Sequence, residues 1–324
     1  MKYKTGLPDT DLSVSLIGLG TSNIGLNMEE KEADRLLDGY LELGGNLIDT
    51  AHVYSNWVLG ERARSERVIG DWIGRNAHNG KREQIVLMTK GGHPEILRDA
   101  PEWGKVRPNH EAMINDLNHS LQKLQTDYID IYFYHRDNRN QTIEEEIETM
   151  EGFVKEGKIR YYGCSNFDTD RMEAATEYCK AKGYRGFVAD QSLLNIGMKS
   201  MKAMSDPTLR CIEGASYVFH KAHPELTAMP YSGNCNGYFQ RYLLEGEEAV
   251  KGMPYDTEGN RKVALQVKKI MEKYGCTVTQ AVMGYFRFQP FLCIPLFGTS
   301  SLGHLCDAWK SLEISFTKED YEGL

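Results

Sequence analysis

The sequence predicts a closed (β/α)8 barrel, in which eight parallel strands alternate with helices, preceded by a short β-hairpin. Eight apolar segments alternate with amphipathic ones in units of about 35–40 residues, which is typical of strand–helix repeats. Three apolar segments run directly into ionisable residues of different types, namely Asp49, Lys90 and His135. Because the strands of a parallel barrel end on one rim, we expect these three side chains to meet there.

Turn and cap signals predict the first elements. A turn-rich tetrad near the start predicts a hairpin within residues 2–14, and a first strand is expected at 16–21. Asn27 and Glu30 have the spacing of a capping box for the first helix, which ends at Gly44. A second strand then leads into the first of the three ionisable strand ends.

The same alternation continues along the chain. Thr142 and Glu145 repeat the capping-box spacing. Within a few residues at each boundary, we expect strands at 85–90, 129–135, 159–164, 187–191, 226–230 and 293–297, and helices at 65–75, 109–124, 142–157, 169–182, 206–217, 261–274 and 277–288. No linker, low-complexity tract or repeat divides the chain, so residues 1–324 are expected to form one domain.

A doubly wound open sheet is the alternative fold for such an alternation. It would require a Gly-x-Gly-x-x-Gly turn after the first strand. Here Gly18-x-Gly20 is followed by Thr21-Ser22-Asn23, which lacks the third glycine. The barrel is therefore favoured.

Composition limits the classes of partner. The 324 residues are 41% hydrophobic and 26% charged, as in an ordinary globular protein. A net charge of −8 argues against a nucleic-acid partner, and no apolar run reaches membrane-spanning length. The seven cysteines form no Cys-x-x-Cys pair, and the start lacks a signal-peptide core, so a reducing, cytoplasmic location is expected.

The three strand ends and a nearby tyrosine have complementary chemistry. Tyr54 follows Asp49 by five residues and can fold over the rim. A lysine ammonium beside a phenol favours the phenolate, so Lys90 is expected to lower the pKa of Tyr54, while Asp49 holds the lysine charged. His135 can donate a hydrogen bond to a carbonyl oxygen. Together these groups form a proton relay suited to carbonyl reduction.

Simpler interpretations exist for each residue. A single strand-end Asp or Lys is more often a solvated rim charge, and a single histidine is more often structural. Four complementary groups on three consecutive strands favour a site instead. His52 and His93 are near enough to suggest a metal site with His135, but they lack ligand-type spacing, so no metal is expected.

Further motifs follow one another in chain order: Asp49-Thr50-Ala51-x-x-Tyr54, Gly60, Ser65-Glu66, Lys90, His135, Gly157-Lys158-Ile159-Arg160-x-x-Gly163-x-Ser165-Asn166, Pro230-Tyr231-Ser232 and Gly298-Thr299-Ser300. Together they resemble the aldo-keto reductase superfamily over almost the whole chain. The resemblance implies a (β/α)8 barrel that binds a nicotinamide dinucleotide, NAD(H) or NADP(H), and interconverts a carbonyl and an alcohol by hydride transfer.

The resemblance also implies roles for individual residues. Tyr54 is the proton donor, Lys90 and Asp49 tune it, and His135 orients the substrate carbonyl. Tyr231 stacks on the nicotinamide, Ser165, Asn166 and Gln191 bind its carboxamide, and residues 298–308 hold the adenosine end. The full set of expected cofactor residues is Gly20, Thr21, Ser165, Asn166, Gln191, Tyr231, Ser232, Asn234, Gly298, Thr299, Ser300, His304, Asp307 and Ala308.

Two positions depart from the family pattern and bear on the choice of cofactor. The usual 2′-phosphate cation and adenine-binding asparagine are replaced by His304 and Ala308. In residues 297–310 the only other basic residue is Lys310, and Asp307 adds a negative charge. Family habit favours NADP(H), but these residues favour NAD(H) or the use of both cofactors, and NAD(H) is preferred because a 2′-phosphate normally needs Arg or Lys. Histidine titrates near pH 6.5, so NADP(H) affinity should gain on NAD(H) affinity between about pH 8 and 6.

Rim loops suggest the substrate class. Trp57, Trp103 and Asp137 follow the relevant strands, and aromatic faces mixed with polar groups suit a sugar, a sugar-like ketone or a polyol. The alternative is that these loops are solvated and do not face the pocket. No feature of the sequence indicates an oligomeric state.

Two other functions use the same barrel. A lyase or isomerase could use Lys90 as a Schiff-base amine, although that chemistry favours a lysine in an apolar pocket over one paired with a carboxylate. A non-catalytic subunit could bind the nucleotide without turnover. The predicted relay favours the oxidoreductase.

Overall fold

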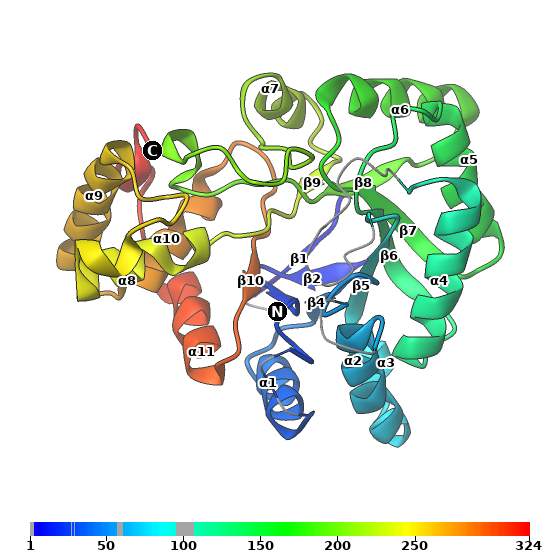
Figure 1. Ribbon diagram of the computed structural model, residues 1–324, viewed down its shortest axis with the longest axis horizontal. Helices are drawn as coiled ribbons and strands as arrows, with labels where there is room; N and C mark the ends of the chain where they lie inside the picture. Colours follow the sequence, from blue (N-terminus) through cyan, green and yellow to red (C-terminus); the bar gives the residue numbers. More distant parts are fainter. Residues whose placement is uncertain (1–2, 27, 29, 57–60, 95–106) are drawn as a thin grey trace.

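The structure is a computed structural model that describes residues 3–26, 28, 30–56, 61–94 and 107–324. Its eight parallel strands surround the centre of the barrel (Figure 1). Backbone hydrogen bonds link β9 (Thr227–Ala228) to the segment before β10 (Leu296–Gly298) and so close the ring. In one of them, Ile294 N donates to the Ala228 carbonyl at 2.8 Å. The strands, in spatial order, are β10 (Leu296–Gly298), β3 (Gly18–Gly20), β4 (Leu47–Asp49), β5 (Val86–Gly91), β6 (Ile129–Tyr134), β7 (Ile159–Cys164), β8 (Phe187–Asp190) and β9 (Thr227–Ala228).

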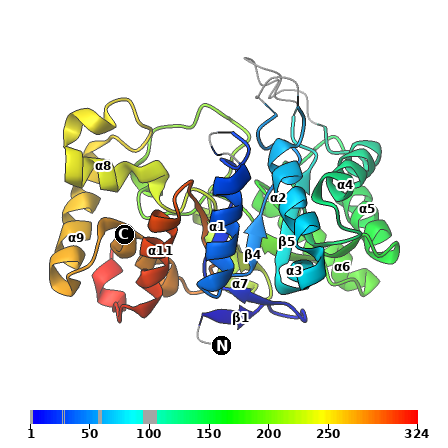
Figure 2. The same ribbon diagram turned by 90° about the horizontal axis from the view of Figure 1, so that it is seen from below.

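Helices flank the strands on the outside. Figure 1 shows α1 to α6 beside β4 to β7, whereas α8, α9 and α10 lie together beyond β10, and Figure 2 shows α8 and α9 on that same side. The helices are α1 (Glu30–Glu42), α2 (Arg64–Arg75), α3 (Lys81–Gln84), α4 (His110–Leu124), α5 (Ile143–Lys155), α6 (Thr169–Lys182), α7 (Gly214–Ala222), α8 (Tyr238–Glu245), α9 (Glu258–Tyr274), α10 (Val278–Gly284) and α11 (Leu302–Lys310).

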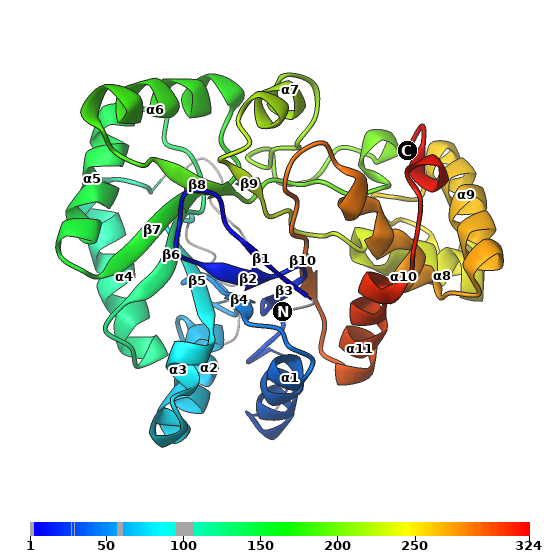
Figure 3. The same ribbon diagram turned by 180° about the vertical axis from the view of Figure 1, so that it is seen from behind.

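A hairpin closes one end of the barrel. Strands β1 (Lys4–Gly6) and β2 (Ser13–Ser15) pair antiparallel and cross the barrel in the rear view of Figure 3. Leu7, Leu12 and Val14 pack into the same apolar cluster as the inward-facing strand residues. The hairpin therefore plugs the N-terminal end and leaves the opposite rim for a site.

The predicted hairpin and barrel are confirmed. The Thr142–Glu145 capping box is present, with both of its reciprocal hydrogen bonds. Asn27, the other predicted cap, lies outside the described residues. Among the described residues, no helix is both long and apolar enough to cross a bilayer.

The expected helix at 206–217 is wrong, because helix α7 begins only at Gly214. The backbone before it pairs elsewhere: Leu193 N donates to the Arg210 carbonyl, and Ile212 N donates to the Leu193 carbonyl, each at 2.8 Å. Helices α8 and α11 were not predicted.

Candidate active site

The ionisable strand ends form the uppermost inward-facing layer of the barrel. Successive side chains of a strand alternate between its two faces. Met88 and Phe133 belong to the apolar cluster inside the barrel, so Lys90 and His135, two positions later, point the same way. Asp49 stands in the same relation to Leu47. The period-2 pattern that fills the core therefore also places the polar groups at its top.

Lys90 is the centre of this layer. Its Nζ lies 2.9 and 2.8 Å from the two carboxylate oxygens of Asp49, 2.8 Å from the Thr50 carbonyl and 3.2 Å from Tyr54 Oη. Burial alone would lower the pKa of Lys90, but the Asp49 carboxylate and Tyr54 outweigh it and hold that pKa above its ordinary value. The lysine is therefore a charged group without a free lone pair.

Tyr54 reaches the layer from the turn after β4. Its N–H donates to the Ala51 carbonyl at 3.0 Å, and Ser55 follows in a left-handed conformation with φ 66°, which turns the chain back over the rim. Burial raises the pKa of the Tyr54 phenol, and the Lys90 ammonium opposes this only in part. The net direction is opposite to the lowered pKa expected from the sequence. Tyr54 is therefore a protonated donor at neutral pH.

His135 completes the group. Its ring lies edge-on to Tyr54, with 5.9 Å between ring centroids and an interplanar angle of 78°. Burial, reinforced by His93, Arg136 and Lys90, holds the pKa of His135 well below its ordinary value. The imidazole is therefore neutral, and it can donate a hydrogen bond to a carbonyl oxygen without bringing a charge.

A cluster of polar residues adjoins the relay. Gln191 Nε2 donates to Asp49 Oδ1 at 2.8 Å, and Ser165 Oγ donates to the Gln191 carbonyl at 2.7 Å. Asn166, in a left-handed conformation with φ 60°, donates to Ser165 Oγ at 2.9 Å and accepts from Tyr231 Oη at 2.7 Å. The four residues expected at the nicotinamide thus form one network that includes the carboxylate of the relay.

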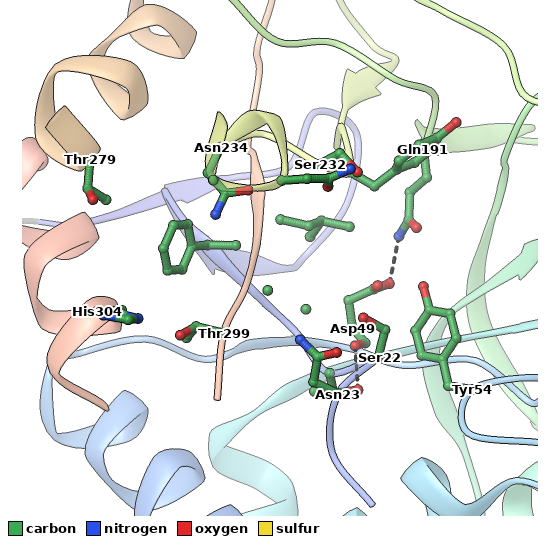
Figure 4. A pocket seen from close by; sticks show the side chains of 18 of the residues that line it. Ser22, Asn23, Asp49, Tyr54, Gln191, Ser232, Asn234, Thr279, Thr299 and His304 are labelled. Carbon is green, nitrogen blue, oxygen red and sulfur yellow. Dashed lines mark hydrogen bonds between the residues drawn. The ribbon is translucent and has the colours of Figure 1, made fainter. Parts of the chain in front are cut away.

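A cavity of about 1010 Å³ extends from the relay toward the outer helices. Figure 4 shows Tyr54, Asp49 and Gln191 at one end, and Thr279 and His304 at the other. Ser22, Asn23, Ser232 and Asn234 lie between the two ends. The cavity is elongated, and hydroxyl and amide groups line its middle, which suits the phosphates and riboses of a dinucleotide.

Most residues expected to bind cofactor line this cavity. The structure brings to it Gly20, Thr21, Ser165, Asn166, Gln191, Tyr231, Ser232, Asn234, Gly298, Thr299, His304 and Asp307. Ser300 and Ala308 are not among the described lining residues, and Ala308 is buried in the core.

The expected substrate residues are placed less favourably. The Asp137 carboxylate accepts from Arg171 Nε at 3.0 Å and is not among the described lining residues. Trp57 and Trp103 lie outside the described residues. Of the three histidines considered for a metal, His93 and His135 have ring centroids 4.6 Å apart, whereas His52 Nε2 pairs with His119 Nδ1 at 2.9 Å. The described residues contain no group of three or more metal-ligand side chains.

Sequence analysis missed part of the cavity wall. Helix α8 contributes Gln240, Arg241, Leu244 and Glu245 to the lining, and Thr279 comes from α10. A signal was present, because Gly237 and Gly246 bracket a short segment with apolar residues at helical spacing.

Comparisons with known proteins agree with this geometry. A protein from Phanerodontia chrysosporium named aryl-alcohol dehydrogenase, with NADP(+) in its name, is 29% identical over 350 aligned residues that cover 100% of this chain and 85% of the relative. A putative aryl-alcohol dehydrogenase of Saccharomyces cerevisiae, AAD14, is 29% identical and covers 97% and 83%. The uncharacterized oxidoreductase YrpG of Bacillus subtilis is 28% identical and covers 98% and 93%.

The family assignment rests on a match over nearly the entire chain. The model of the Aldo/keto reductase family matches residues 16–324, which include every strand of the barrel and the four residues of the relay. The chain belongs to the aldo/keto reductase family.

Proposed function

We propose that this protein is an NAD(P)(H)-dependent oxidoreductase that interconverts a carbonyl and an alcohol, with Tyr54 as the general acid and base. One observation carries the proposal. The buried Lys90 ammonium, paired with Asp49, lies 3.2 Å from Tyr54 Oη at the end of a cavity of about 1010 Å³. A charged lysine beside a phenol is suited to stabilising the phenolate that proton donation leaves behind.

Each residue of the relay has a separate task. When bound, the dinucleotide supplies a hydride to the carbonyl carbon. Tyr54 donates its proton to the oxygen on which negative charge develops, and neutral His135 donates a hydrogen bond to the same oxygen. Lys90 stabilises the resulting phenolate, and Asp49 keeps Lys90 charged and in place. In the oxidative direction Tyr54 accepts the proton.

The nicotinamide end would be held by the network beside the relay. Gln191 uses its Nε2 on Asp49, whereas none of the described residues donates to its Oε1, which remains available to a carboxamide N–H. Tyr231 lines the cavity beside Asn166 and offers its ring face to the nicotinamide. Gln191 therefore couples cofactor binding to the carboxylate that positions the lysine.

The geometry disfavours a Schiff-base enzyme. Such chemistry needs a neutral lysine amine, but the Lys90 ammonium directs its protons at Asp49, Thr50 and Tyr54. Borohydride added with a carbonyl substrate should therefore trap no lysine adduct, as intact-mass spectrometry would show. A stoichiometric adduct at Lys90 would favour the lyase.

For the substrate we propose an aryl aldehyde and its alcohol. Two relatives are named aryl-alcohol dehydrogenases, and Val53, Leu209 and Tyr231 give the cavity apolar surface near the relay. Asp137, one of the polar groups that suggested a sugar, is paired with Arg171. Sugars are the competing prediction, because the aromatic faces of Trp57 and Trp103 in the rim loops suit the C–H groups of a sugar.

A substrate panel tests the function and its substrate class together. NADH or NADPH consumption would be followed with benzaldehyde-type aldehydes, aldoses and sugar ketones. We expect turnover, with kcat/KM larger for the aryl aldehydes. A larger kcat/KM for sugars would contradict the substrate class alone. Tight cofactor binding without turnover of any carbonyl would favour the non-catalytic subunit.

A further inference from the structure

Among the described residues that line the cavity, one Arg or Lys side chain has a charge that is not already paired. Three Arg or Lys residues are among its described lining, namely Lys90, Arg136 and Arg241. Lys90 is paired with Asp49, and Arg136 Nη2 lies 2.8 Å from Asp206, with all four residues buried. Over the described part of the chain, the Arg241 guanidinium makes no hydrogen bond or ion pair, although Glu245 is one helical turn away.

The residue before Arg241, Gln240, donates from its Nε2 to Thr279 Oγ1 at 3.4 Å, and Figure 4 places Thr279 at the end of the cavity opposite Tyr54. Arg241 belongs to α8, which packs against α9 and α10 beyond β10 (Figure 1). The cavity wall in this region also includes Thr279 of α10 and His304 of α11, which Figure 4 places opposite Tyr54. A dinucleotide whose nicotinamide lies beside Tyr54 would therefore place its adenosine near Arg241.

Part of the negative charge near Arg241 is already compensated by hydrogen bonds within the protein. Asp307, which also lines the cavity, accepts hydrogen bonds from Thr277 Oγ1 at 2.8 Å and from Gln280 Nε2 at 2.7 Å. Glu245 remains as an exposed carboxylate. A guanidinium can bind a phosphate through two parallel hydrogen bonds. The exposed Glu245 carboxylate, four residues from Arg241, would weaken these bonds but would not prevent them.

We propose that Arg241 binds the adenosine 2′-phosphate and so directs this protein to NADP(H). The inference rests on the proposed function, because it assumes that the cavity holds a nicotinamide dinucleotide. It revises the expectation of NAD(H), which counted only the cations in residues 297–310. Arg241 is distant in sequence from that segment, and the packing of α8 beside α10 brings it to the same cavity.

The pyrophosphate is the other anionic group that Arg241 could bind. Ser22, Asn23, Ser232 and Asn234 line the middle of the cavity, where the pyrophosphate would lie. NAD(H) and NADP(H) share this group but differ in the 2′-phosphate. A residue that reads the 2′-phosphate must therefore change the affinity for one cofactor and not for the other.

The test is a set of binding titrations by ligand fluorescence and calorimetry, which require no turnover. Arg241→Ala should raise the Kd of NADPH by about 10- to 100-fold and that of NADH by less than about 2-fold. The same substitution should weaken 2′,5′-ADP but not 5′-AMP. Lys310→Ala removes an equal charge from an exposed α11 residue that is not among the described lining, and it should change neither Kd.

Each outcome decides a specific point. Arg241→Lys should recover part of the NADPH affinity, because it restores the charge without the bidentate geometry. An equal loss for both cofactors would assign Arg241 to the pyrophosphate and overturn the inference, as would unchanged NADPH binding by Arg241→Ala. If the wild-type protein binds neither cofactor, the proposed function itself fails.

Discussion

The two ends of the cavity are built on different physical principles. At the end that holds the proposed relay, Asp49 and Lys90 are 3% and 2% exposed and are paired with each other. At the outer end, Arg241 and His304 are exposed, and Arg241 has no charged partner among the described residues. Buried charges must be compensated within the protein, whereas exposed charges can remain unpaired until a ligand arrives. The end that holds the proposed relay is therefore preorganised, and the outer end is suited to ligand selection.

The largest expected difference between the two ends concerns stability. Lys90→Met leaves the Asp49 carboxylate buried without its cation and should lower the free energy of unfolding by about 3–5 kcal/mol. Arg241→Met, a matched substitution at the outer end, should change it by less than about 0.5 kcal/mol. Urea unfolding measures both. Equal effects would show that the two cations are not in different environments.

Glu66, which accepts a hydrogen bond from Thr89, the residue before Lys90, predicts that stability depends on pH at the end of the cavity that holds the proposed relay. Burial raises the pKa of Glu66 to about 7, and Oε1 accepts from Thr89 at 2.5 Å. Between pH 4.5 and 7 the unfolded chain loses this proton and the folded chain keeps it, so the stability contributed by this group falls as pH rises. Glu66→Gln should therefore gain on wild type by on the order of 3 kcal/mol between pH 4.5 and 8. A pH-independent difference would contradict the raised pKa.

A smaller expected effect, on cofactor affinity, distinguishes the two ends of the cavity by whether it is the same for NADH and NADPH. Gln191→Leu removes one hydrogen bond expected at the carboxamide, which NADH and NADPH share, and should raise both Kd values by about 10-fold. The ratio of the two Kd values should stay constant, in contrast to the result expected for Arg241→Ala. A changed ratio would mean that Gln191 affects the adenosine end as well.

The contrast also explains what could be predicted from the sequence. Asp49, Lys90 and His135 were found because each continues the period-2 pattern of an apolar strand, and strand order fixes their neighbours. Arg241 was missed because its position depends on how α8 packs beside α10, which no local pattern encodes. The α7 segment was misplaced for a similar reason, since a long-range pairing at Leu193 competes with the helix.

The predicted pKa of Tyr54 shows a related limit. Its neighbour Lys90 was identified correctly, and the distance of 3.2 Å agrees with the expected contact. The net shift was wrong because burial, which the sequence does not quantify, outweighs the lysine. Partners at strand ends are thus more predictable than the balance of energies among them.

The central claim is that Tyr54 donates the proton that accompanies hydride transfer. The most direct measurement is a single-turnover reaction of an aryl aldehyde with NADPH carrying deuterium at its transferable position, for wild type and Tyr54→Phe. We predict that deuterium appears on the alcohol carbon, that Tyr54→Phe slows this transfer by about 10²–10⁴-fold, and that cofactor Kd changes by less than about 2-fold. A variant that retains most of the wild-type rate, or a wild-type product without the label, would contradict the account.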